Sequence, residues 1–208
     1  MLRSLFKSEG FLFIIKFLSL FALLYFFCIA FISITYRASN PFYVFLRDYL
    51  NYIDWLRYST LRTSEFFCKL IGVESFIEDR IIIHVTNSPK KLHMGYDCIG
   101  YGVMSFWTAF IIANKTSFTK KIYWLIGGCV VIWFINCIRV AVLLTALRNN
   151  WPISKYLDHH TTFNIISYLL ILALIFTYIK FDKSAAKKGT TWFPVQEIAF
   201  CTLKGSFS

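Results

Sequence analysis

Four apolar runs separated by polar segments dominate the pattern of the chain. The first covers residues 11 to 35 (FLFIIKFLSLFALLYFFCIAFISIT), and the others cover roughly residues 98 to 114, 122 to 147 and 161 to 180. Runs of about 17 to 25 apolar residues can cross the hydrocarbon layer of a membrane as helices. The pattern predicts an all-α polytopic membrane protein, a bundle of about four to six transmembrane helices, with an uncleaved N-terminal anchor within residues 1 to 36.

The polar segment between the first two runs, residues 37 to 97, shows two further patterns. Over residues 42 to 71, apolar and charged residues alternate at helical spacings. This predicts one or two amphipathic helices on the membrane surface, or a partly re-entrant pair. The stretch RIIIHV, residues 80 to 85, is followed by the turn-forming TNSPKK. We therefore expect a small extracytoplasmic β-hairpin that returns the chain to Cys98.

Composition and charge support the membrane class and fix a topology. The chain has 208 residues, of which 57% are hydrophobic and only 16% charged. A soluble domain of this size could not bury so much apolar surface. The net charge of +11 comes from basic residues beside the apolar runs, which favours anionic lipid as their partner rather than nucleic acid. The positive-inside rule predicts a cytoplasmic N-terminus, a three-helix core over residues 98 to 182 and a cytoplasmic tail over residues 183 to 208.

Several polar residues fall near the outer ends of the last three runs in this topology. Cys98 begins the second run, and His159 and His160 begin the fourth. Asn136 and Arg139 lie one helical turn apart on the same face of the third run, with Arg139 about 13 Å below its outer end. An arginine inside a membrane is costly unless it faces protein, water or a partner, so Arg139 is a candidate functional residue.

The chemistry that fits these residues is acyl transfer by a thiolate. A helix N-terminus lowers the pKa of a cysteine such as Cys98, and a histidine can protonate the leaving amine. Arg139 can stabilise the oxyanion of the tetrahedral intermediate. Gly100 leaves room for a substrate backbone, and Asp158 can cap the last helix. The spacings of the histidines and cysteines indicate no metal site, and we expect no cofactor.

These motifs resemble the exosortase and archaeosortase superfamily over roughly residues 60 to 180. The resemblance lies in an outward Cys-Gly element, an Asn-x-x-Arg motif within a span and a histidine at the start of the last core span. The form DHHxxFN is similar to members from the Bacteroidetes. The usual Cys-Ser/Ala-Gly reads Cys98-Ile99-Gly100 here, and the chain is short for the family.

The resemblance implies a membrane-embedded cysteine peptidase or transpeptidase of the bacterial inner membrane, with its active site facing outward. Cys98 would be the nucleophile, Arg139 the oxyanion stabiliser and His160 the general acid/base, with Asn136 as the motif's asparagine. His159 is the alternative to His160. The substrate would be an exported protein that ends in a short motif, a transmembrane helix and a basic tail.

Two other readings of the same residues remain open. In one, the protein is a non-enzymatic transporter or assembly factor in which Asn136 and Arg139 bind an anion or brace a partner. That reading predicts a silent Cys98→Ala variant and a damaging Arg139→Ala variant. In the other, the histidines bind a redox cofactor, although adjacent histidines point to different faces of a helix.

Overall fold

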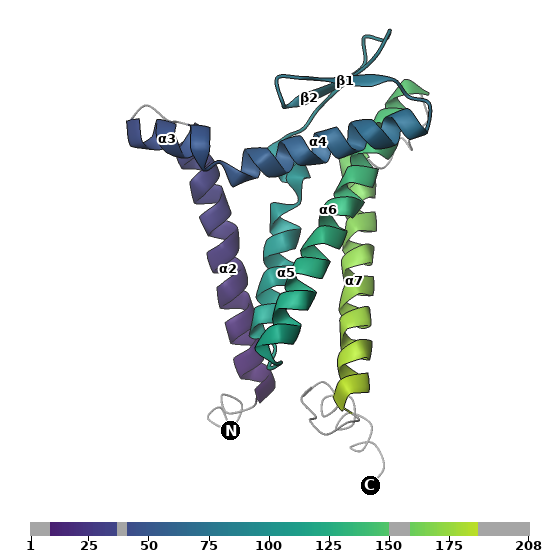
Figure 1. Cartoon of the computed structure of the whole chain (residues 1–208). Coiled ribbons are helices and arrows are strands. Elements are labelled where there is room, and N and C mark those ends of the chain that lie inside the picture. Colours follow the sequence, from purple (N-terminus) through teal and green to yellow (C-terminus); the bar gives the residue numbers. More distant parts are fainter. Residues whose placement is uncertain (1–8, 37–40, 150–158, 187–208) are drawn as a thin grey trace.

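The computed structural model of the protein describes residues 9–36, 41–149 and 159–186. Its elements in chain order are α2 (Glu9–Tyr36), α3 (Pro41–Tyr49), α4 (Tyr52–Leu70), β1 (Ser75–Glu78), β2 (Ile82–Val85), β3 (Lys91–His93), the 3₁₀ turn η1 (Tyr96–Ile99), α5 (Tyr101–Ala113), α6 (Phe118–Arg148) and α7 (His159–Ala186). The helices α2, α5, α6 and α7 stand roughly upright, and α3 and α4 lie across one end of them (Figure 1). The sheet lies beyond α4 at that end. The prediction of a mostly helical protein is confirmed.

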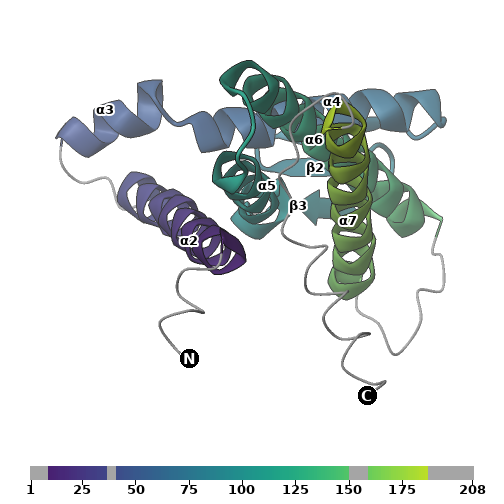
Figure 2. The ribbon, with the colours of Figure 1, turned by 90° about the horizontal axis from the view of Figure 1, so that it is seen from below.

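The upright helices form a row in which contacts run from α2 to α5, from α5 to α6 and from α6 to α7. The view from below shows α5 between α2 and α7 (Figure 2). Among the described residues, α2 and α6 are the helices long and apolar enough to cross a membrane. The 13 residues of α5 extend only about 20 Å, less than the apolar layer of about 30 Å. The number of spans therefore stays a prediction.

The surface of α2 suits contact with lipid. The helix is strongly apolar, yet side chains such as Leu23 and Phe26 are 67% and 64% exposed. In water such a surface would be strongly unfavourable, whereas lipid tails are as apolar as the side chains themselves. The exposure of α2 is thus consistent with the predicted anchor.

Helix α4 packs against α6 through one face. Its buried residues recur three or four positions apart, as expected for a helix with a single buried stripe. Polar contacts join the two helices: Trp133 Nε1 donates to Ser59 Oγ at 3.2 Å, and Ser64 Oγ donates to the carbonyl of Cys137 at 2.9 Å. The position of α4 is therefore fixed against α6 by directional bonds as well as by packing.

The predicted hairpin is a three-stranded antiparallel sheet in the order β1-β2-β3. Ile77 pairs with Ile83, and Ile83 pairs with Leu92. The sequence prediction placed Arg80 at the start of a strand, which was wrong. Asp79 and Arg80 have φ of 51° and 58°, so they form a turn between β1 and β2. The sequence analysis did not predict β1, because this strand before the turn contains no long β-branched run.

Helices α5 and α6 pack closely where Trp107 of α5 contacts Trp124 and Gly128 of α6. Trp107 is fully buried, and its Nε1 donates to the carbonyl of Trp124 at 3.0 Å. A Cβ added to Gly128 would lie 1.9 Å from that nitrogen. Gly128 therefore provides the space that the indole fills.

Candidate active site

Cys98 lies in η1, a 3₁₀ turn that precedes α5. Its backbone N–H donates to the carbonyl of Gly95 at 3.1 Å. Gly100 follows the turn with φ of +85°, and α5 begins at Tyr101. The sequence prediction that Cys98 begins the second span was therefore wrong, because the left-handed Gly100 separates the cysteine from the helix. The half-buried Cys98 packs against the apolar cluster that α4, the sheet and α6 share.

Asn136 joins this turn to α6. Its Nδ2 donates to the carbonyl of Ile99 at 2.7 Å, and the residue is only 5% exposed. A Cβ added to Gly100 would lie 2.2 Å from the same nitrogen. The Asn136 amide therefore takes the space where a Cβ would lie, while Gly100 also lines the cavity, and the expectation that it leaves room for a substrate backbone stays a prediction. The Cys-Ile-Gly element and the Asn-x-x-Arg motif are thus in direct contact.

A cavity of about 690 Å³ opens beside this contact. It is mostly apolar, with Asn136 and Arg139 at one end, and that size is typical of a binding site for a small molecule or a short chain segment. Its lining residues come from α2, α5, α6 and α7 and the glycine that precedes α5: Phe21, Tyr25, Gly100, Tyr101, Gly102, Val103, Phe106, Ile132, Ile135, Asn136, Arg139, Tyr168, Ile171, Leu172 and Ile175.

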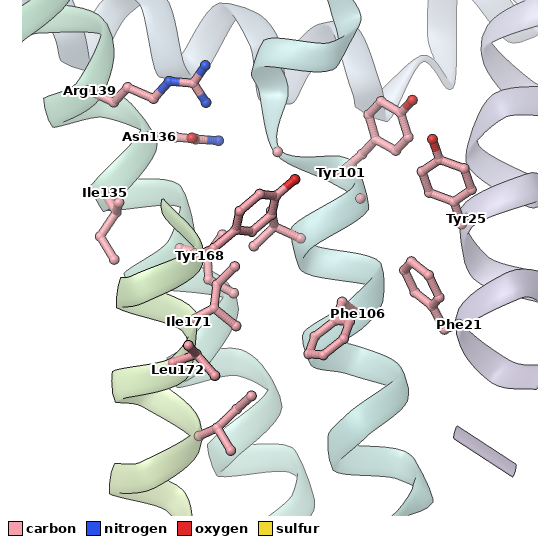
Figure 3. Close-up of a pocket in the computed structure, with 15 residues that line it drawn as sticks. Phe21, Tyr25, Tyr101, Phe106, Ile135, Asn136, Arg139, Tyr168, Ile171 and Leu172 are labelled. Atoms are coloured by element: carbon pink, nitrogen blue, oxygen red, sulfur yellow. The ribbon is translucent and has the colours of Figure 1, made fainter. Parts of the chain in front are cut away.

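The polar end of the cavity carries a positive charge. Arg139 and Asn136 extend from α6 toward the start of α5 (Figure 3). No aspartate or glutamate is among the lining residues that belong to the described part of the chain. Arg139 is half-buried, so its charge acts in surroundings less polar than water. The prediction that Asn136 and Arg139 share one face of the helix is confirmed, because both line the cavity.

The two histidines stand at the beginning of α7. The helix starts at His159, and Tyr168, eight residues after His160, lines the cavity. Eight helical residues span about 12 Å, so the backbone of His160 lies about that far along α7 from the cavity-lining Tyr168. The side chains of both histidines, and Asp158, lie outside the described residues. Their predicted roles stay predictions.

The structure brings together Gly100, Asn136 and Arg139, and it places Cys98 two residues from the cavity-lining Gly100. Cys98 itself is not among the lining residues. No group of three His, Cys, Asp or Glu side chains suited to a metal occurs in the part of the chain that the structure describes.

The sequence analysis did not identify two sets of residues near the site. Tyr25, Tyr101 and Tyr168 line the cavity from three helices, and the rings of Tyr25 and Tyr101 stack at 5.6 Å. Tyrosines are so frequent in this chain that none of them was distinctive. Arg57 on α4 lies against Tyr96 of η1, with its Cζ 4.8 Å from the ring centroid. Its place on the buried stripe of α4 was the signal that could have found it.

Tyr96 is partly buried and lies near two charged side chains. Burial raises the pKa of its hydroxyl, and the nearby carboxylate of Asp54 raises the pKa further, while Arg57 acts in the opposite direction. Tyr96 therefore stays protonated at neutral pH. The segment that carries Cys98 thus begins in a partly desolvated environment near Arg57 and Asp54.

Comparison with known proteins gives one match. Residues 10–177 match the family model described as Transmembrane exosortase (Exosortase_EpsH). No curated protein and no solved structure matched the chain. The matched range contains the Cys98 turn, the Asn136–Arg139 motif and the start of α7. The chain therefore belongs to the transmembrane exosortase family, which implies a membrane-embedded function of the transpeptidase type on exported proteins with sorting signals.

Proposed function

We propose that the protein is a cysteine peptidase or transpeptidase that cleaves the C-terminal sorting signals of exported proteins at the outer face of the bacterial inner membrane. The observation that carries the proposal is the hydrogen bond from Asn136 to the carbonyl of Ile99. It joins the turn of Cys98 to the helix that carries Arg139, although the two motifs are 37 residues apart in sequence. Family membership supplies the reaction class.

In the proposed reaction, the thiolate of Cys98 attacks the carbonyl carbon of the scissile peptide bond. Negative charge develops on the carbonyl oxygen, and the guanidinium of Arg139 stabilises it. His160, with His159 as the alternative, gives a proton to the leaving nitrogen as the C–N bond breaks. The C-terminal helix of the substrate leaves with a free amine, and the remainder stays bound to Cys98 as a thioester.

Water or an amine then attacks the thioester carbonyl, and the histidine accepts a proton from the attacking group. The bond to sulfur breaks, which releases the product and restores the thiolate. The mostly apolar cavity below Arg139 would hold the substrate segment next to the scissile bond, because it ends at the cation. Its volume of about 690 Å³ is far too small for a whole transmembrane helix. The helix of the substrate would therefore lie outside the cavity, in the membrane.

The experiment replaces Cys98 with alanine in cells that also express a secreted protein ending in a short motif, an apolar helix and a basic tail. The proposal predicts that the C-terminal segment stays attached to that protein, as read from its mass. Processing that continues at the normal rate in Cys98→Ala would refute the role of Cys98. A loss in Arg139→Ala with a silent Cys98→Ala would instead favour the non-enzymatic reading.

A further inference from the structure

Arg57 is a buried cation on the face of α4 that packs into the protein. Only 7% of the residue is exposed. An arginine in such a place loses hydration and needs partners inside the protein. Its contacts therefore indicate what the guanidinium does.

Among the described side chains, the guanidinium of Arg57 contacts the carboxylate of Asp54 and the ring of Tyr96. Its Nη2 pairs with the carboxylate of Asp54, and Asn51 donates to the other oxygen of that carboxylate. Asn51 also caps α4 by accepting from the backbone N–H of Asp54 at 3.2 Å. On its other side, Arg57 lies over the ring of Tyr96, with Cζ 4.8 Å from the centroid. The start of α4 thus holds the guanidinium against Tyr96.

Tyr96 is the first residue of η1, and Ile99 is the last. Arg57 contacts the first residue, and Asn136 binds the carbonyl of the last. Cys98 lies between these two contacts. The short turn is therefore fixed at both ends, from α4 and from α6.

We propose that Arg57 is a positioning residue for Cys98, which holds the turn at Tyr96 so that the thiol keeps one orientation. The inference rests on the proposed catalytic role of Cys98. A short 3₁₀ turn has poor hydrogen-bond geometry of its own and depends on its surroundings for rigidity. Misplacing a reacting group by about 1 Å can cost about a hundredfold in rate.

The chemistry of the contact favours positioning over simple stabilisation. Buried ion pairs can often be replaced by apolar side chains without loss of stability, so stability alone does not account for an arginine here. A planar guanidinium instead gives direction, because it pairs with the carboxylate of Asp54 while it lies over the ring of Tyr96. The contact with Tyr96 thereby limits how the turn can rotate.

The test compares Arg57→Met and Tyr96→Leu with Arg62→Met in the full-length protein in detergent. Arg62 is an exposed control on the same helix, which pairs with Glu65 at 3.1 Å and has its Cζ 5.6 Å from the ring of Tyr58. Its contacts stay within α4, so it does not hold η1. Mass spectrometry follows the rate at which iodoacetamide alkylates each cysteine.

The proposal predicts that alkylation of Cys98 becomes several-fold faster in Arg57→Met and in Tyr96→Leu, and unchanged in Arg62→Met. Cys68 is fully buried in α4 and reports on unfolding, so it should stay unlabelled in all three. The double variant Arg57→Met/Tyr96→Leu should label no faster than the single variants, because both remove one contact.

Two outcomes would overturn the inference. One is a Cys98 rate that does not differ between Arg57→Met and Arg62→Met. The other is faster labelling of Cys68 in parallel with Cys98, which would make Arg57 a packing residue. Arg57→Lys guards against a variant that fails to fold: it keeps the charge but loses the planar contact, and it should label Cys98 at an intermediate rate.

The same variants separate this inference from the proposed function. Faster labelling of Cys98 in Arg57→Met, together with undiminished substrate processing in Cys98→Ala, would support the positioning role of Arg57 and refute catalysis by Cys98. Unchanged labelling, together with lost processing in Cys98→Ala, would do the reverse. If both proposals hold, Arg57→Met lowers kcat at least about tenfold with little change in KM, because positioning acts on the reacting group and not on binding.

Discussion

Replacing Gly100 with alanine disturbs the contact between the Cys98 turn and α6 in two separable ways. Gly100 has φ of +85°, a conformation that costs any other residue about 1–2 kcal/mol. The new Cβ would also lie 2.2 Å from Nδ2 of Asn136 and displace it from the buried carbonyl of Ile99. Losing that bond costs about 1–3 kcal/mol. We expect a total loss of about 2–5 kcal/mol in the free energy of unfolding.

Two other glycines provide controls for the separate contributions. Gly72 has φ of +79° with open space around its Cβ position, so Gly72→Ala should cost only the backbone strain of about 1–2 kcal/mol. Gly95 has φ of −66° and open space, so Gly95→Ala should change stability by less than about 0.5 kcal/mol. Unfolding by a denaturing detergent in mixed micelles, followed by circular dichroism, gives all three values.

A double variant tests whether Asn136 is the partner. Asn136→Ala alone leaves the carbonyl of Ile99 unsatisfied and should cost about 1–3 kcal/mol. In Gly100→Ala/Asn136→Ala the added methyl group no longer meets the amide, so the combined loss should be smaller than the sum of the single losses. The reasoning is refuted if Gly100→Ala costs no more than Gly72→Ala, or if the two losses simply add.

Three further predictions concern other parts of the molecule. Gly128→Ala should destabilise the protein by about 1–3 kcal/mol, because its Cβ would meet Trp107, whereas Gly127→Ala has open space and should be nearly neutral in the same unfolding assay. Burial, with the carboxylate of Glu65, raises the pKa of the Cys68 thiol to about 11, so Cys68 contributes stability that is present below pH 9 and lost between about pH 9 and 11. Unfolding free energies of the wild type and Cys68→Ala should therefore converge over that range, and parallel curves would contradict the buried thiol. Arg139→Gln should lower the rate of substrate processing about 10²–10³-fold with the thiol labelling of Cys98 unchanged, and a loss below tenfold would remove Arg139 from the proposed mechanism.

The helices of the bundle were predictable because their sequence signal is local. The third apolar run, predicted over residues 122 to 147, corresponds to Phe118–Arg148 in the structure. Helical periodicity alone placed Asn136 and Arg139 on one face, and both line the cavity. Fixed spacing within one helix is enough for such an inference.

The details around Cys98 were not predictable, because they depend on contacts between distant segments. Gly100 was noted as a small residue, but its left-handed φ and the amide of Asn136 beside it come from the packing of α6. The buried stripe of α4 includes Arg57, but it does not indicate that the partner is Tyr96, 39 residues away. Tertiary packing buries Arg57, although charged residues are rarely buried.

The proposed mechanism requires Cys98 and a histidine at the start of α7 to lie close together. A short bifunctional thiol reagent applied to His160→Cys and His159→Cys variants tests this directly, with the cross-linked peptides identified by mass spectrometry. Thr108→Cys is the positive control, because Thr108 Oγ1 lies 3.9 Å from the sulfur of Cys129. We expect a cross-link between Cys98 and position 160, and a lower yield of the cross-link to position 159. A cross-link in the control with none from Cys98 to either position would contradict the proposed site.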